Sequence, residues 1–193
     1  MRQALKTQER RQLVVDGSLP AMQVWRTLPE GTRAEVIDGK LSTLPSPTTR
    51  HADITGHIFF ELMMILRKVK KGKVFHAPVD VFLNDEDDVV IPDIVYVSND
   101  NKKAHVIGRG IVGAPDLIVE ALSPGNVRHD RVIKRQLYEK AGVKEYCVVD
   151  PDLRSAQTWI LNKGKFEQLT ETELSMYTHV LERFIRLDKY NRI

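Results

Sequence analysis

The apolar run from Leu117 to Leu122 constrains the fold of this chain more than any other segment. It reads Leu-Ile-Val-Glu-Ala-Leu, and an almost continuous run of this kind is typical of a strand buried on both faces. A second buried strand is predicted at 145–150, and a helix from Asp130 to Ala141, ended by Gly142, lies between them. Strand, helix and strand in this order predict a right-handed crossover between parallel strands.

The other predicted elements surround this crossover. Residues 35–41 are typical of a β-hairpin because an Asp-Gly turn separates two short strands. A helix is predicted from Thr48 or Thr49 to about Lys70, where Gly72 closes it, since its apolar residues recur at helical spacing. Further predictions are a short helix at 22–28, strands at 74–76, 79–83 and 89–97, a surface loop at 99–113, a hairpin within 158–169 and a weak edge strand within 176–187. The pattern predicts an α/β fold with a mixed β-sheet flanked by helices.

The length of 193 residues suits one domain. Residues 1–20 are polar and contain Gly17 and Pro20, so we expect them to form a loosely attached N-terminal arm and residues 21–193 to form the domain. No apolar run approaches the roughly 20 residues that span a bilayer. The basic N-terminus is not followed by the apolar stretch of a signal peptide, and Cys147 has no partner for an internal disulfide. We therefore expect a cytoplasmic protein without a membrane segment.

Two carboxylates lie inside predicted hydrophobic strands. Burying Glu120 as an unpaired ion costs on the order of several kcal/mol, so it requires a cation, a metal ion or a proton as partner. Asp93, within the apolar segment 89–97, requires a partner for the same reason. Two acids from separate strands can share one divalent ion, and oxygen ligands favour Mg²⁺ or Mn²⁺. Two alternatives stay open: Asp93 can bond local backbone amides, and Glu120 can pair with a buried lysine or arginine.

The helix after Glu120 carries a second group of polar side chains. Asp130, Lys134 and Tyr138 are spaced four residues apart and share one face. If this face leans over the end of the Glu120 strand, the Lys134 ammonium can stabilise charge on a phosphoryl transition state or orient a water. In the alternative interpretation, Asp130 and Lys134 form an ordinary surface ion pair.

These residues resemble the PD-(D/E)xK nuclease superfamily, and within it a family of restriction-endonuclease-like proteins common in bacterial genomes. The resemblance runs from about Glu35 to Asp152. The matching blocks, in order, are Glu-Val-Ile-Asp-Gly-Lys (35–40), Pro-Ser-Pro-x-x-x-His (45–51), Pro-Val-Asp-Val (78–81), Val-Val-Ile-Pro-Asp-Ile (89–94), Gly-Ala-Pro-Asp-Leu-Ile-Val-Glu-Ala-Leu-Ser-Pro (113–124), Asp130 with Lys134 and Tyr138, and Ala-Gly-Val-Lys-Glu-Tyr-x-Val-Val-Asp (141–150).

The resemblance implies a restriction-endonuclease-like fold and a Mg-dependent endonuclease that hydrolyses DNA phosphodiester bonds, leaving a 5′-phosphate. It assigns Asp93 and Glu120 to the two motif acids, which bind Mg²⁺ (or Mn²⁺) with the main-chain carbonyl of Ala121. The motif lysine is expected two residues after Glu120, where this chain has Leu122. Either Lys134 supplies the ammonium from the helix, or the protein is a catalytically inactive module that binds nucleic acid or protein on a nuclease fold.

Several further residues are secondary candidates for the site or its surroundings. We expect Arg128, His129 and Arg131, within a basic stretch, to contact nucleic acid. His51 either organises water near the metal or is a capping or core histidine. Glu35 is either an extra acid near the site or an ordinary strand residue.

The net charge of +3 is compatible with a DNA partner without requiring one. Nucleases that cut both strands often act as dimers, so a homodimer is one expectation. The apolar tail from Met176 onward either packs on that partner or closes the chain's own core. The sequence contains no recognisable base-reading motif.

Overall fold

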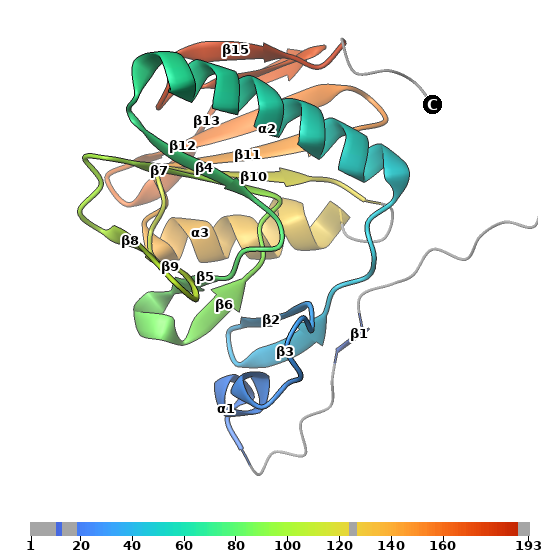
Figure 1. The fold of residues 1–193 in the computed structure, drawn as a ribbon. Helices are drawn as coiled ribbons and strands as arrows, with labels where there is room; N and C mark the ends of the chain where they lie inside the picture. The colour runs from blue at the N-terminus through green and yellow to red at the C-terminus, as the bar shows by residue number, and fades with distance from the viewer. Residues whose placement is uncertain (1–10, 13–18, 124–126, 189–193) are drawn as a thin grey trace, which may run out of the picture.

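The structure is a computed structural model that describes residues 11–12, 19–123 and 127–188 (Figure 1). The helices are α1 (Ala21–Arg26), α2 (Thr49–Val69) and α3 (Arg135–Ala141), with a 3₁₀ turn at Asn84–Glu86 and a π-helical segment at His129–Lys134 directly before α3. The first strands are β1 (Arg11–Gln12), β2 (Ala34–Ile37), β3 (Lys40–Thr43), β4 (Gly72–His76), β5 (Val81–Leu83), β6 (Asp88–Val90), β7 (Ile94–Ser98), β8 (Ala104–Ile107) and β9 (Gly110–Gly113). They are followed by β10 (Leu117–Ala121), β11 (Glu145–Asp150), β12 (Ser155–Asn162), β13 (Lys165–Glu173), β14 (Ser175–Thr178) and β15 (Arg183–Arg186). The predicted arm, residues 1–20, lies outside the described residues except for β1 and residues 19–20.

The described strands form two large mixed sheets and a small hairpin. One sheet has the order β1-β3-β2-β6-β5-β9-β8, the other has the order β13-β12-β11-β10-β7-β4, and β14 pairs with β15. Within the second sheet β10 and β11 are parallel, with Leu117 opposite Glu145. The predicted parallel pairing of these two strands is therefore confirmed, as is the α/β class. The sequence indicated one mixed sheet, and the second large sheet is a finding of the structure.

Helices α2 and α3 lie on opposite faces of the second sheet (Figure 1). The alternation of side chains along β10 explains this arrangement. Leu117, Val119 and Ala121 pack in the cluster that contains the apolar residues of α2, whereas Ile118 and Leu122 pack in the cluster that contains Leu137 of α3. Glu120 has the same parity as Ile118 and Leu122, so its side chain belongs to the α3 face.

The long helix begins and ends for local reasons. Thr48 caps α2 by accepting a hydrogen bond from the His51 backbone N–H at 3.2 Å, as the sequence predicted. The predicted closure at Gly72 is wrong, because Lys70 forms the left-handed C-cap with φ 54°. Gly72 instead begins β4, where an added Cβ would lie 2.3 Å from the Val97 carbonyl oxygen.

Two strand predictions need correction. The predicted strand 89–97 is two strands in different sheets, β6 and β7, with Ile91, Pro92 and Asp93 between them. The predicted loop 99–113 contains the hairpin β8–β9. Its polar, glycine-containing sequence resembles a loop, but β9 is held by parallel pairing to β5, which no local pattern reveals.

The tail closes the chain's own core. Met176, Ile185 and Leu187 are buried in the same cluster as the apolar face of α2, and the tail forms the hairpin β14–β15. Buried Glu145 anchors this hairpin by accepting hydrogen bonds from Thr178 Oγ1 and two backbone amides. Among the described residues, no helix is long and apolar enough to cross a membrane.

Candidate active site

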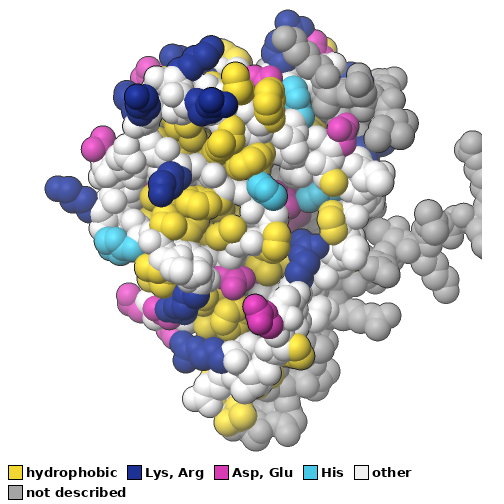
Figure 2. All heavy atoms as spheres, viewed as in Figure 1, with side chains coloured by type: hydrophobic (Ala, Val, Ile, Leu, Met, Phe, Trp, Pro, Cys, Tyr) yellow, Lys and Arg dark blue, Asp and Glu magenta, His cyan; other side chains and the backbone are white. Residues whose placement is uncertain are grey.

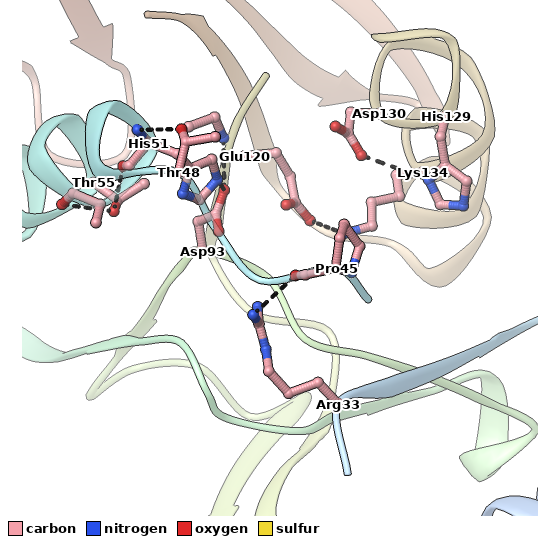
Figure 3. A network of polar contacts seen from close by, with 12 residues as sticks. Arg33, Pro45, Thr48, His51, Thr55, Asp93, Glu120, His129, Asp130 and Lys134 are labelled. Atoms are coloured by element: carbon pink, nitrogen blue, oxygen red, sulfur yellow. Dashed lines mark hydrogen bonds and ion pairs between the residues drawn. The ribbon is translucent and has the colours of Figure 1, made fainter. Parts of the chain in front are cut away.

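Asp93 lies where the chain passes from one large sheet to the other. The pairing of β7 with β10 ends at Ile94 and Val119. The N–H of Ala121, which is the next β10 amide on this edge, therefore faces the junction between the two sheets. The Ala121 N–H donates to Asp93 Oδ2 at 2.8 Å, and His51 Nε2 lies 3.0 Å from the same oxygen (Figure 3). Asp93 is thus bonded to a backbone amide, as one alternative predicted, but the amide belongs to the neighbouring strand and is not local.

Glu120 is buried among donors from the helical segment opposite its strand. Lys134 Nζ lies 2.6 Å from Glu120 Oε1, and the Tyr138 hydroxyl donates to the same oxygen at 2.7 Å. All three side chains are almost completely buried. The predicted lean of the helix face over the Glu120 strand is therefore present in the structure, and Glu120 has a lysine partner.

Glu35 on β2 brings the first sheet into this cluster. Its Oε1 lies 3.0 Å from Lys134 Nζ and accepts a hydrogen bond from the Ile91 N–H at 2.9 Å. Glu35 is fully buried, and its carboxylate lies beside the Lys134 ammonium. One ammonium is consequently held between two buried carboxylates from different sheets.

The electrostatics of the cluster favour an added positive charge. Burial raises the pKa of Glu120 to about 8; Lys134 opposes the rise, while Asp93, Asp130 and Glu35 add to it. A single ammonium shared by Glu35 and Glu120 cannot neutralise both, so a proton or a cation is favoured on Glu120. For His51, burial lowers the pKa, but the hydrogen bond and charge of Asp93 outweigh burial, so the pKa is raised above 6.5.

The donor set suits a hard divalent cation. Asp93 Oδ1 and Glu120 Oε2 make no hydrogen bond or ion pair with any described residue, since the contacts of these acids go to Oδ2 and Oε1. The carbonyl of Ala121 lies on the same strand edge as its N–H, which faces Asp93. In the part of the chain that the structure describes, no group of three or more His, Cys, Asp and Glu side chains is arranged to hold a metal. Mg²⁺ commonly uses only one or two carboxylates with water and substrate oxygens, so this set fits it.

Comparison with known proteins identifies the family. The model of the Uma2 family, described as "Putative restriction endonuclease", matches residues 19–184. The chain belongs to the Uma2 family.

A solved structure supports the fold independently of sequence. The crystal structure of "a putative nuclease belonging to DUF820" from Anabaena variabilis superposes with a TM-score of 0.71 at 16% identity, covering 89% of this chain and 97% of that chain. At that identity the likeness shows the fold alone, and it is a nuclease-like fold. No curated protein matches the chain.

The helical segment of this Uma2 protein begins with an unusual turn. Residues 129–134 are π-helical, where a single regular α-helix was expected, and such wide turns often occur at functional sites. Asp130 is buried, with its carboxylate 3.5 Å from His129 Nδ1 and its carbonyl accepting from the Tyr146 hydroxyl at 2.8 Å. The alternative of a surface Asp130–Lys134 pair is therefore wrong, because both side chains are buried.

The predicted nucleic-acid residues lie at the start of the same segment. Arg128 is exposed, and Arg131 is partly exposed with Nη2 3.7 Å from Asp150 Oδ2. His129 is largely buried beside Asp130. Their contact with nucleic acid stays a prediction.

Sequence reasoning missed Arg33 and the space next to Asp93. Arg33 Nη1 donates to the Pro45 carbonyl at 3.2 Å, which places a guanidinium across from Asp93 (Figure 3). A lone arginine before a hairpin carries no signal that distinguishes it from other surface arginines. Figure 2 shows histidine side chains around a hollow on this face of the molecule.

Proposed function

We propose that this protein is a Mg²⁺- or Mn²⁺-dependent endonuclease that hydrolyses DNA phosphodiester bonds. One observation carries the proposal: Lys134 Nζ reaches Glu120 Oε1 at 2.6 Å from the opposite helical segment. Leu122, at the position of the motif lysine, is buried in the hydrophobic core. Leu122 is apolar and cannot supply the ammonium group of the motif lysine. Lys134 instead brings an ammonium group to Glu120 from the helical segment that faces its strand.

The proposed roles follow from the contacts. Asp93, Glu120 and the Ala121 carbonyl would hold the divalent ion, which supplies Lewis-acid charge and a water of lowered pKa when bound. Lys134, held by Glu35 and Glu120, would stabilise the negative charge that develops on the phosphoryl oxygens.

The surrounding residues hold this arrangement in place. Tyr138 fixes one oxygen of Glu120 and His51 fixes one oxygen of Asp93, so the other oxygens keep a defined direction. Arg128 and Arg131 are proposed to contact the DNA backbone, with His129 beside them. We also propose that the protein is located in the cytoplasm, together with its DNA substrate. We propose further that it forms a homodimer in which each copy cuts one DNA strand.

The test is plasmid nicking with Mg²⁺ or Mn²⁺, combined with calorimetric titration of each metal. Asp93→Ala is expected to lose both metal binding and nicking. Lys134→Ala should reduce nicking by about 10²- to 10³-fold, the usual effect of removing one transition-state stabiliser. Lys102→Ala, an exposed lysine in the β7–β8 loop, is the control and should nick like the wild type.

The buried core position of Leu122 also supports a second candidate, a catalytically inactive module that binds nucleic acid or protein. The same experiment separates the two. DNA binding without nicking, together with no heat of metal binding at millimolar concentration, supports the inactive module. Undiminished nicking by folded Lys134→Ala would contradict the role proposed for that lysine.

A further inference from the structure

A cleft of about 400 Å³ lies beside the carboxylate cluster, between the first half of α2 and the segment that follows β4. Asp93 and His51 form part of its wall, so the cleft is continuous with the candidate active site. Its volume falls in the range of pockets that hold a small organic molecule, which is typically about 300–1,000 Å³.

The walls of the cleft are largely aromatic and apolar. Phe59 and His76 face it as an edge-to-face pair with ring centroids 4.6 Å apart, and Ala52 and Pro78 complete the apolar surface. Thr55 adds a hydroxyl. A flat heterocycle fits such walls because an aromatic side chain stacks on any nucleobase and a polar group can bond its edge.

Gly56 on α2 adds open space to the wall of the cleft. It lies in the interior of a helix, where glycine is less stable than alanine. A Cβ added there would meet nothing within 4 Å, so neither packing nor a turn requires glycine. Since Gly56 lines the cleft, the missing side chain leaves space against the helix backbone.

Arg33 supplies positive charge at the same cleft. Its guanidinium makes no ion pair with a described carboxylate and is held by the Pro45 carbonyl. Arg33 lines the cleft together with His51 and Asp93, so its positive charge lies on the side of the cleft next to the candidate active site. A guanidinium in the wall of a largely apolar cleft beside the candidate phosphodiester site matches a nucleoside that carries a phosphate.

We propose that this cleft binds one unstacked nucleoside next to the phosphate that is cleaved, so that the preferred substrate contains an unpaired nucleotide. The inference rests on the proposed nuclease function and specifies its substrate class. A base inside a continuous duplex cannot enter the cleft without leaving its stack, whereas a bulged or mismatched nucleotide enters at smaller cost.

The test measures binding in EDTA, so it does not depend on catalysis. The probe is a DNA duplex with a single unpaired 2-aminopurine, compared with the fully paired duplex that carries the same base. For the wild type we expect tighter binding of the first probe and a change in 2-aminopurine fluorescence as the base stacks on protein. Base–aromatic stacking typically changes affinity about 5- to 150-fold, so the preference should be about fivefold or more.

Gly56→Leu fills the cleft and should abolish both the preference and the fluorescence change. Because leucine is a better helix former than glycine and a Cβ at position 56 meets nothing within 4 Å, the melting temperature of the variant should not fall. Phe59→Leu keeps an apolar side chain and should weaken the preference. Phe60→Leu is the matched control, since Phe60 is exposed on α2 and does not line the cleft.

The outcomes separate this inference from the proposed function. Equal binding of both probes by the wild type, or an unchanged preference in Gly56→Leu, overturns the nucleoside cleft even if plasmid nicking depends on Asp93 and Lys134. A preference lost in Gly56→Leu, in a protein that nicks no DNA, supports the cleft as a binding site and overturns only the nuclease.

Discussion

Replacing Glu120 by glutamine should make the stability of the protein less dependent on pH. Glutamine has nearly the same shape, and its amide oxygen can still accept from Lys134 Nζ and the Tyr138 hydroxyl. The variant therefore removes one titrating group from the buried cluster while keeping its hydrogen bonds. Any difference between the two proteins in the slope of stability against pH then reports on the Glu120 carboxyl.

The magnitude follows from the pKa of Glu120. Its ordinary value is 4.5, and burial, opposed by Lys134 and reinforced by Asp93, raises it to about 8 in the folded protein. Between these values the folded protein binds a proton that the unfolded chain has lost. The stability that the proton provides is complete below pH 4.5 and is lost as the pH rises through about 8. The loss is about 1.4 kcal/mol per pH unit, or roughly 5 kcal/mol across the range.

The assay is urea unfolding of wild type and Glu120→Gln at pH 5, 6, 7 and 8, with EDTA in every buffer. The free energy of unfolding of the wild type should fall relative to the variant as the pH rises, because other titrating groups are common to both. A difference that stays constant over this range would refute the reasoning and would mean that Glu120 remains ionised in its pair with Lys134.

Three further predictions concern single positions. Gly56→Ala should raise the free energy of unfolding by about 0.5–1 kcal/mol, measured with urea, because alanine favours the helix and its Cβ meets no neighbour. Gly113→Ala should destabilise by about 2 kcal/mol or more in the same assay, since φ is 91° and the new Cβ would lie 1.9 Å from the Lys103 carbonyl oxygen. Glu145→Ala should speed proteolytic cleavage within 175–187, because Glu145 accepts from Thr178 Oγ1 and the amides of His179 and Val180.

Each of these has a clear contrary result. A less stable Gly56→Ala would show that the helix there needs glycine for a reason within the protein. A fully stable Gly113→Ala would mean that the β8–β9 hairpin relaxes without cost. Unchanged proteolysis of Glu145→Ala, with Glu171→Ala as an exposed control, would show that apolar packing alone holds the C-terminal hairpin.

Local patterns were sufficient for several parts of the fold. The apolar spacing and the Thr48 cap predicted α2 almost to the residue, and the Leu117–Leu122 run with the following helix predicted the parallel crossover. These features depend on neighbours in the sequence, so their signals are local. Glu120 could be singled out for the same reason, since a carboxylate inside an apolar run requires a partner wherever the strand is placed.

The tertiary structure alone determined which partners meet. The pairing of β9 with β5 turned an expected loop into a hairpin, and it joins residues about thirty positions apart, such as Val81 and Ile111. Glu35 reaches Lys134 because the two large sheets meet at this point. Contacts of this kind depend on how separate elements pack, and no periodicity encodes them.

The sequence by itself determined the kinds of residue at the site, two acids within apolar segments and a helical segment with Asp130, Lys134 and Tyr138 on one face. Only the tertiary structure decided that Lys134 lies 2.6 Å from Glu120, and that a cleft with Gly56 and Arg33 opens beside Asp93. The physical reason is that hydrophobicity and side-chain chemistry are properties of single residues. Distance, burial and shared charge instead belong to pairs brought together by packing.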